Sequence, residues 1–236
     1  MKLGIIGAME IEVESLVRKL QDPMITEKAG SAFYEGTLQG MKVVVVRCGI
    51  GKVNAALCVQ ILCDCFDVTH VINTGIAGSL DAALDIGDLV VSRDVMHHDF
   101  DCRIFGYAMG QVPGMGVTAF PADEKLAGFA YGAAQTVHPE HVRKGRIASG
   151  DQFISSPEQK ARIVADTGAL CAEMEGTAIA QAAYRNGIPF VIIRAISDKA
   201  DNSAQMDYPT FEAIAAKRCA KVTETVAKMM KESTEM

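Results

Sequence analysis

Short runs of consecutive apolar residues alternate with segments of helical periodicity along almost the whole chain. The apolar runs lie at residues 2–9, 42–49, 69–75, 87–96, 143–150, 169–174 and 189–197. Most of them are apolar on successive positions, which is typical of strands that helices cover on both faces. Each run therefore predicts a buried strand.

Helical patterns occupy intervals between these runs. One is marked by apolar residues at i, i+3, i+4 and i+7, namely Val13, Leu16, Val17 and Leu20. A second begins at Ser156, which can cap a helix that has Pro157 in its first turn and Gln159 three residues after the cap. A third covers about 176–186, and a last one runs from near Pro209 towards Lys231.

The repeated order of strand and helix predicts one α/β domain over residues 1–236, built around a mostly parallel sheet. We find no linker, internal repeat or low-complexity segment. The least regular stretch is 97–121, which is rich in glycine and aromatic residues, and a loop of this length is usually a functional or interface element. Ligands of open α/β sheets bind beyond the carboxyl ends of the strands, so the search for chemistry begins there.

Composition narrows the class of protein. The chain has 236 residues, of which 49% are apolar, and a formal charge of −6 without any run of Lys or Arg. A nucleic-acid partner is therefore not expected. The seven cysteines show no zinc-type spacing and several lie in apolar runs, which indicates buried free thiols and a reducing cytosol. No window is long and apolar enough for a signal peptide or a membrane span, so we expect a cytoplasmic protein without a membrane partner.

Four strand ends carry polar or glycine-rich segments, at 7–12, 73–79, 173–176 and 194–198. The ionisable residues of interest in them are Glu12, Glu173, Glu175, Asp198 and Arg194. The chain has no Walker A sequence, no GxGxxG after a strand and no GxSxG elbow, and none of its five histidines lies in these segments. His97, His98 and Asp99 are adjacent, but neighbouring strand residues face opposite ways, so a shared metal ion is not expected.

A site made of carboxylates, with neither a metal signature nor an activated nucleophile, indicates acid–base work on a small molecule. Cleavage of a glycosidic bond fits, because one acid can protonate the leaving group while a second carboxylate activates water. The residues alone leave structural interpretations open. Glu12 can complement a helix dipole, Asp198 can cap a turn, Met174 can fill the core, and 73–79 can be a tight turn without a ligand.

Six segments in order along nearly the whole chain carry a family resemblance: GIIGAMEIE, CGIGKVNAA, NTGIAG, SGDQFI, EMEG and RAISDKAD. Together they resemble the bacterial 5′-methylthioadenosine/S-adenosylhomocysteine nucleosidases of the nucleoside phosphorylase superfamily. The resemblance implies a single α/β domain with a central mixed, partly barrel-like sheet flanked by helices, in a homodimer. It also implies cofactor-free hydrolysis of the N-glycosidic bond in methylthioadenosine, S-adenosylhomocysteine and 5′-deoxyadenosine, which releases adenine and serves methionine salvage.

Residue by residue, the resemblance implies that Asp198 is the general acid and Glu12 the general base. Arg194 would help position the attacking water, and Glu175 would grip the ribose hydroxyls. The implied substrate contacts are Met9, Ile50, Ile76, Ala77, Gly78, Phe153, Ile154, Glu173, Met174, Ser197 and Tyr208. Within this set, Phe153 would stack on adenine, while the implied contributions of the neighbouring subunit to the 5′ pocket are Cys102, Phe105 and Pro113.

The sequence departs from the family pattern at three positions. Ile76 stands where many relatives carry a small hydroxyl residue, Gly176 follows EME in place of Ala, and Tyr208 replaces a common Phe. None of these changes removes a catalytic group.

Three other functions stay open at this point. A nucleoside phosphorylase would need cations for phosphate, whereas 7–12 carries acids and 73–79 has no Arg. A hydrolase of futalosine-type nucleosides would use the same purine chemistry. A non-catalytic nucleoside-binding protein on the same fold would be marked by loss of Glu12 or Asp198, and both are present.

Overall fold

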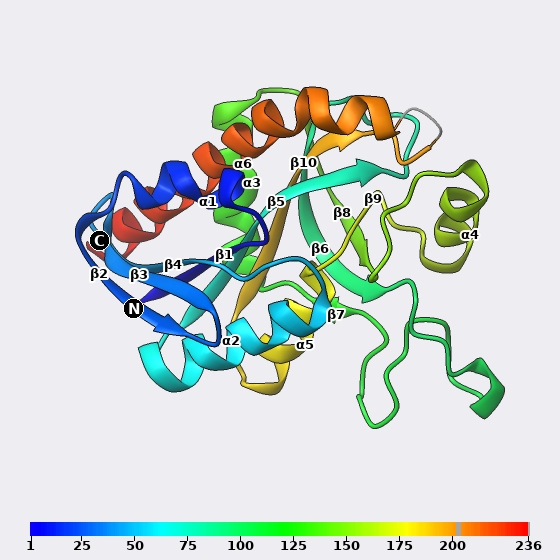
Figure 1. Cartoon of the computed structure of the whole chain (residues 1–236), viewed down its shortest axis with the longest axis horizontal. Helices are drawn as coiled ribbons and strands as arrows, with labels where there is room; N and C mark the ends of the chain where they lie inside the picture. The colour runs from blue at the N-terminus through cyan, green and yellow to red at the C-terminus, as the bar shows by residue number, and fades with distance from the viewer. Residues whose placement is uncertain (202–203, 236) are drawn as a thin grey trace.

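The computed structural model describes residues 1–201 and 204–235 (Figure 1). In chain order the elements are β1 (Leu3–Gly7), α1 (Glu10–Val17), β2 (Gln21–Lys28), β3 (Ser31–Leu38), β4 (Met41–Arg47), α2 (Lys52–Phe66), β5 (His70–Ser79), β6 (Leu89–His97), η1 (Arg103–Phe105), β7 (Phe120–Pro121), α3 (Glu124–Val137), β8 (Val142–Ser149), α4 (Pro157–Thr167), β9 (Cys171–Glu173), α5 (Gly176–Arg185), β10 (Phe190–Asp198) and α6 (Ala204–Glu235).

Five strands close into a barrel. β5 pairs in parallel with β10, β10 pairs antiparallel with β6, β6, β8 and β9 follow in parallel, and β9 returns antiparallel to β5. β1, β4, β3 and β2 extend the sheet from β5 as an open arm. The sheet is therefore mixed and partly barrel-like, as the family resemblance implies, and not mostly parallel.

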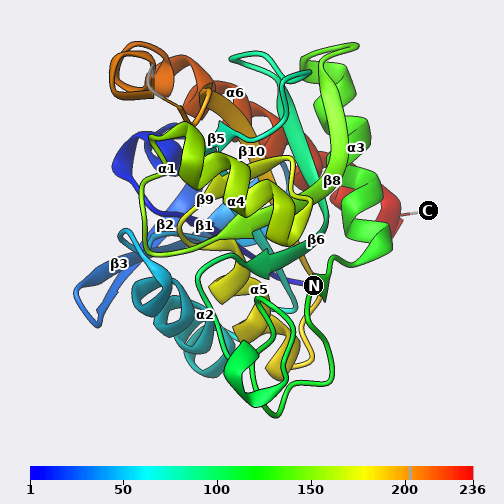
Figure 2. The ribbon, with the colours of Figure 1, turned by 90° about the vertical axis from the view of Figure 1, so that its right-hand side faces the viewer.

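Helices cover the sheet in two groups (Figures 1 and 2). α2 and α5 pack side by side on one face, and α6 packs with α1 and α3 on the other. Every residue of β1 and of β10 is buried between these groups, which explains why both strands read as continuous apolar runs. The barrel, together with β1 beside β5, thus holds the carboxyl ends of β1, β5, β9 and β10 in fixed relation.

Two helix predictions are confirmed. α4 begins at Pro157 with Ser156 as its cap, whose Oγ accepts the Gln159 N–H at 3.2 Å. α5 spans Gly176–Arg185 and stops before Gly187. The prediction for the last helix is wrong at its start, because α6 begins at Ala204 and includes Pro209.

Other elements have no counterpart in the predictions. The β2–β3 hairpin at 21–38 is absent from them because all eight residues of β2 are exposed, and an edge strand without a buried face shows no apolar run. The sequence pattern does not predict α2 or α3 either. The buried face of α3 is largely alanine, for example Ala130 and Ala133, and alanine gives a weak periodic signal.

The irregular segment predicted at 97–121 is present between the ends of β6 and α3. Apart from the single turn η1 and the short strand β7, it has no regular structure, and it projects from the barrel beside α5 (Figure 1). Among the helices in the described ranges, none combines the length and apolar character that crossing a bilayer requires.

Candidate active site

A cavity of about 360 Å³ opens where β1, β5, β9 and β10 end. Its lining consists of Ala8, Met9, Glu12, Ile50, Ile76, Ala77, Gly78, Phe153, Ala172, Glu173, Met174, Glu175, Ser197, Asp198 and Tyr208. Most of the residues singled out from the sequence thus meet at one place. None of these described lining residues is Lys, Arg or His, so the cavity is bordered by carboxyl groups and apolar side chains.

Glu12 is held by backbone donors on both sides. Its Oε2 accepts the N–H groups of Ala8 at 2.7 Å and Met9 at 3.0 Å, and its Oε1 accepts that of Ile76 at 3.1 Å. Burial raises the pKa of Glu12, while the nearby Arg194 guanidinium and these N–H donors oppose the rise. The carboxyl therefore does two things: it caps the start of α1, and it lies fixed at the cavity wall.

Asp198 ends β10 on another side of the cavity. Its Oδ2 accepts the Ser197 hydroxyl at 2.8 Å, and its Oδ1 accepts the Ala200 N–H at 2.8 Å. Burial is the main cause that raises the pKa of Asp198, and the neighbouring Asp201 and Asp207 add to it. A carboxyl with a raised pKa keeps its proton to higher pH, as a general acid requires.

Two glycines of β5 make room for these two carboxyls. A Cβ on Gly75 would overlap Glu12 Oε1. A Cβ on Gly78 would lie 2.8 Å from Asp198 Oδ1. Gly75 and Gly78 belong to a strand, so the tight-turn interpretation of 73–79 is wrong, and their lack of side chains is what admits the carboxyl groups.

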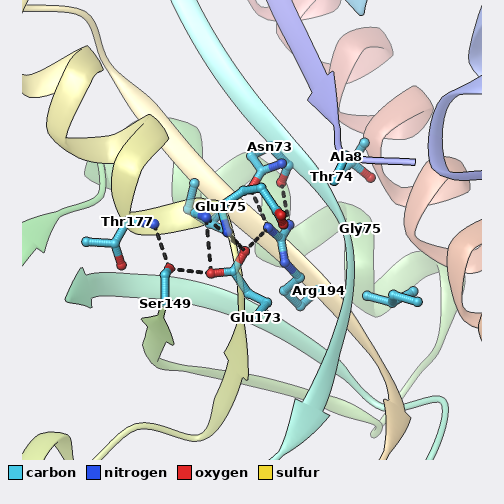
Figure 3. A network of polar contacts seen from close by, with 12 residues as sticks. Ala8, Asn73, Thr74, Gly75, Ser149, Glu173, Glu175, Thr177 and Arg194 are labelled. Carbon is cyan, nitrogen blue, oxygen red and sulfur yellow. Dashed lines mark hydrogen bonds and ion pairs between the residues drawn. The ribbon is translucent and has the colours of Figure 1, made fainter. Parts of the chain in front are cut away.

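Glu173 lies at the cavity wall, but its carboxylate is engaged by the protein (Figure 3). One oxygen accepts the Ser149 hydroxyl, and the other accepts Arg194 Nη2. Both oxygens also accept the Gly176 N–H at the start of α5. Arg194 therefore holds the pKa of Glu173 below its usual range despite complete burial. The substrate contact expected for Glu173 remains a prediction, while its observed contacts position Arg194 and α5.

Glu175, at the start of α5, has fewer hydrogen-bond partners among the described residues than Glu173. Its Oε1 accepts the Gly51 N–H at 2.7 Å, the one hydrogen bond found for its side chain in the described structure. Burial, together with the charge of Glu173, raises the pKa of Glu175 to about 8. Its other oxygen is free to meet a ligand hydroxyl.

Arg194 lies behind the cavity rather than in its wall. Its Nη atoms donate to the Asn73 side chain and to Glu173 (Figure 3). They also donate to the Ile193 carbonyl. The Nε–H is buried and has no acceptor within the described residues. No role is predicted from the sequence for Asn73 or Ser149, although each begins a segment singled out near the end of a predicted strand.

Apolar side chains close the rest of the cavity. Tyr208 donates its hydroxyl to Met9 Sδ at 3.1 Å, and its ring meets that of Phe153 edge-on with centroids 5.6 Å apart. Ile50 and Phe153 are about half exposed in the single chain. Ile154 is buried next to Phe153 and is not among the lining residues, so a contact of its backbone with the substrate base stays a prediction.

The residues expected from a neighbouring subunit lie outside the cavity of their own chain. Cys102, Phe105 and Pro113 all belong to the projecting segment between β6 and β7. Phe105 is 78% exposed and Ile104 is 89% exposed. A contribution of these residues to a partner's pocket stays a prediction.

One group of possible metal ligands exists within the described chain, at Asp88, His138 and His141. The Asp88 carboxylate already pairs with His141 Nδ1 at 2.9 Å, and the two imidazole rings stack. None of the three lines the cavity, so the chemistry of the cavity does not involve them.

Comparisons with known proteins agree with this geometry. The model of the phosphorylase superfamily matches residues 2–228. The 5′-methylthioadenosine/S-adenosylhomocysteine nucleosidase of Exiguobacterium sp. is 43% identical over 99% of this chain and 100% of its own. The Neisseria meningitidis nucleosidase in complex with methylthio-immucillin-A is 40% identical, with a TM-score of 0.93 over 97% of this chain and 99% of that one. A futalosine hydrolase of Helicobacter pylori is 32% identical, with a TM-score of 0.92 over 97% and 98%. The chain therefore belongs to the phosphorylase superfamily and, within it, to the family of 5′-methylthioadenosine/S-adenosylhomocysteine nucleosidases.

Proposed function

We propose that this protein hydrolyses the N-glycosidic bond of 5′-methylthioadenosine and S-adenosylhomocysteine, and also that of 5′-deoxyadenosine. The products are adenine and the 5′-substituted ribose. The observation that carries the proposal is the composition of the cavity, which has four carboxyl side chains and no cationic side chain among its described lining residues. Water can approach such a site, whereas phosphate would be repelled by the carboxylates and would lack partners.

Carboxyl groups on two sides of the cavity act on different parts of the reaction, one on the leaving group and the other on the water. Asp198 donates its proton to N7 of adenine, so that the base leaves as a neutral molecule when the C–N bond breaks. Glu12 takes a proton from the attacking water, whose oxygen forms the new bond to the sugar carbon. Glu175 holds the ribose hydroxyls, and its negative charge favours the positive charge that develops on the ring. Met174 packs beneath the sugar, and Phe153 stacks on the base.

Arg194 helps to position the water from behind the Glu12 carboxyl. Its unpaired Nε–H is the available donor, because Glu173, Asn73 and Ile193 occupy the Nη atoms. Ile76 offers its backbone N–H to Glu12 and brings no hydroxyl to the water. Backbone N–H groups therefore orient the carboxyl of Glu12, the general base, and Glu12 and Arg194 in turn orient the water.

The walls of the cavity favour a thioether substrate. Met9, Ile50 and Tyr208 surround the 5′ side, and apolar and sulfur-containing side chains suit a thioalkyl chain. The Helicobacter pylori neighbour is a futalosine hydrolase, so a futalosine-type nucleoside is the second candidate substrate. Comparison of turnover for methylthioadenosine, S-adenosylhomocysteine and futalosine separates the two assignments.

The deciding experiment is incubation with methylthioadenosine, with and without phosphate, followed by identification of the sugar product. We expect adenine and free methylthioribose at the same rate in both mixtures. Methylthioribose phosphate, with turnover that requires phosphate, would assign a phosphorylase. Tight binding without any product would assign a nucleoside-binding protein.

We also propose that the protein works as a homodimer in the cytosol. Val53 and Leu57 of α2 are exposed, at 72% and 52%, and line the apolar cavity between α2 and α5. Phe105, on the projecting segment, is also exposed. An exposed apolar surface of this kind commonly marks a protein–protein interface, so we expect it to be buried against a second copy of the chain. All seven cysteines are unpaired, which supports a reducing compartment. Sedimentation should give a dimer, and Phe105→Asp should raise KM for methylthioadenosine. A fully active monomer with unchanged KM would contradict the shared pocket.

A further inference from the structure

A second set of polar contacts lies outside the cavity lining, where α2 begins. Gly51 precedes the helix and directs its N–H to Glu175. The next N–H, that of Lys52, donates to Asp151 Oδ1 at 2.9 Å. Glycine has no side chain with which to cap the helix, so the cap comes from Asp151, a residue far away in sequence.

Asp99 fixes both partners of this contact. Its Oδ1 accepts Lys52 Nζ at 2.6 Å, and its Oδ2 accepts the Asp151 N–H at 2.9 Å. The side chains of Lys52 and Asp99 are only 20% and 18% exposed, so this ion pair is partly shielded from solvent. Gly150 allows the close approach, because a Cβ there would lie 2.9 Å from Asp99 Cγ.

We propose that Asp151 and Asp99 are positioning residues for the proposed hydrolysis, on which this inference rests. They hold the first turn of α2 against the 150–154 segment, so that the Gly51 N–H stays directed at the carboxyl of Glu175. Neither residue lines the cavity, and both act through the backbone of α2. The 150–154 segment also carries Phe153. The same contacts therefore fix the position of Phe153, which stacks on adenine, relative to Glu175, which binds the ribose.

The Gly51 N–H matters because of the charges around Glu175. Burial raises the pKa of Glu175 most, and the charges of Glu173 on β9 and Glu12 on α1 raise it further. Arg194 on β10 and the Gly51 N–H lower it. Cys48, after β4, faces the same group as a neutral thiol, because burial raises its own pKa. If the N–H moved away, Glu175 would hold its proton to higher pH, and less of it would be ionised at neutral pH.

The test compares kcat/KM for methylthioadenosine across the pH range in the wild type and three variants. Asp151→Ala removes the acceptor for Lys52 N–H. A hydrogen bond to a charged group corresponds to about tenfold or more, so we expect a loss of that size with the acidic limb of the profile moved to higher pH. Asp151→Asn keeps an acceptor oxygen and should stay close to the wild type. Asp99→Asn should lose activity in the same direction as Asp151→Ala.

Asp67→Asn is the matched control for Asp99→Asn. Asp67 is exposed at the other end of α2 in a left-handed conformation that Asn also adopts, so the charge change is equal and the positioning contact is untouched. This control should leave both kcat/KM and the pH profile unchanged. If Asp151→Ala lowered activity without moving the acidic limb, or if Asp151→Asn failed to rescue it, the positioning role would be refuted.

A measurement without turnover separates this inference from the proposed function. Carbon-13 NMR can follow the Glu175 carboxyl through a pH titration, with Glu175→Gln to assign the resonance. We expect the pKa of Glu175 to rise in Asp151→Ala and to stay in place in Asp151→Asn. An unchanged titration would overturn the inference even if the wild type released adenine. Failure of the wild type to cleave any adenine nucleoside would overturn the proposed function, whatever the titration showed.

Discussion

Replacement of Asp198 by Asn separates the role of a general acid from a structural role. The amide has the shape of the carboxyl, and its oxygen can accept the Ala200 N–H as Asp198 Oδ1 does. The amide NH2 would face the Ser197 hydroxyl, which lies 3.4 Å from the Ala77 carbonyl and can turn to donate there instead. Both hydrogen bonds therefore have a replacement, and we expect the free energy of unfolding to change by less than about 1 kcal/mol.

The loss should fall on turnover. A positioned acid contributes about 10²- to 10⁴-fold, which corresponds to roughly 3–5 kcal/mol in the transition state. Asp198→Asn should therefore lower kcat for methylthioadenosine by that factor while substrate affinity stays close to the wild type. A nitrophenyl riboside releases a stable anion that needs no proton from the enzyme. The same variant should cleave it at nearly the wild-type rate.

The assay follows adenine by chromatography and nitrophenolate by absorbance, with the melting temperature and the affinity for a methylthio-immucillin as controls. The pH profile gives a second test. Because burial raises the pKa of Asp198, wild-type kcat for methylthioadenosine should fall as rising pH removes the proton, and the variant should lack this limb. An equal loss on both substrates, with fold and inhibitor affinity intact, would refute the assignment of Asp198 to the leaving group.

Three further predictions test the same structure. Glu12→Gln should slow both substrates by about 10²-fold or more, because each still needs an activated water, and equal rates to the wild type on the riboside would contradict this. Gly75→Ala should lower kcat for both substrates by about tenfold or more, because its Cβ would displace the Glu12 carboxyl; an unchanged Glu12 position in a crystal structure would refute the cause. Glu224 accepts hydrogen bonds from Lys19, Lys221 and Gln39, and these contacts lower its pKa to about 2. The contribution of Glu224 to stability is therefore present above its unfolded pKa, and it is lost as pH falls from about 5 to about 2. Urea unfolding of Glu224→Gln should show lower stability than the wild type at neutral pH and no difference at the acid end of that range.

Much of the fold was predictable because its strands are buried on both faces. β1, β4 and β10 are apolar runs in the sequence, and the residues around Ser156 predict the cap of α4. The closure of β5 onto β10 was not visible in such a pattern, because a run of apolar residues does not name its partner strand. The resemblance to a family implied a partly barrel-like sheet, without saying which strands close it.

The candidate site divides in the same way. The carboxyl residues and their places after strands were visible in the sequence, since Asp198 directly follows an apolar run and Glu12 lies three residues after one. Their environments were not. That Gly75 and Gly78 leave space for these two carboxyls depends on which strands are neighbours in the sheet. The engagement of Glu173 by Ser149 likewise depends on the register between β8 and β9, where Ser149 lies opposite Glu173.

One physical cause, the burial of carboxyl groups, serves both halves of the proposed reaction. Glu173 and Arg194 neutralise each other within the protein, so the unpaired carboxyls of the cavity are Glu12, Glu175 and Asp198. Burial raises the pKa of all three. On the side of the base, Asp198 therefore has a proton to give. On the side of the sugar, positive charge that grows on the ribose ring favours the ionised form of Glu175, whose charge then stabilises the transition state more than the ground state. That difference is the condition for acceleration.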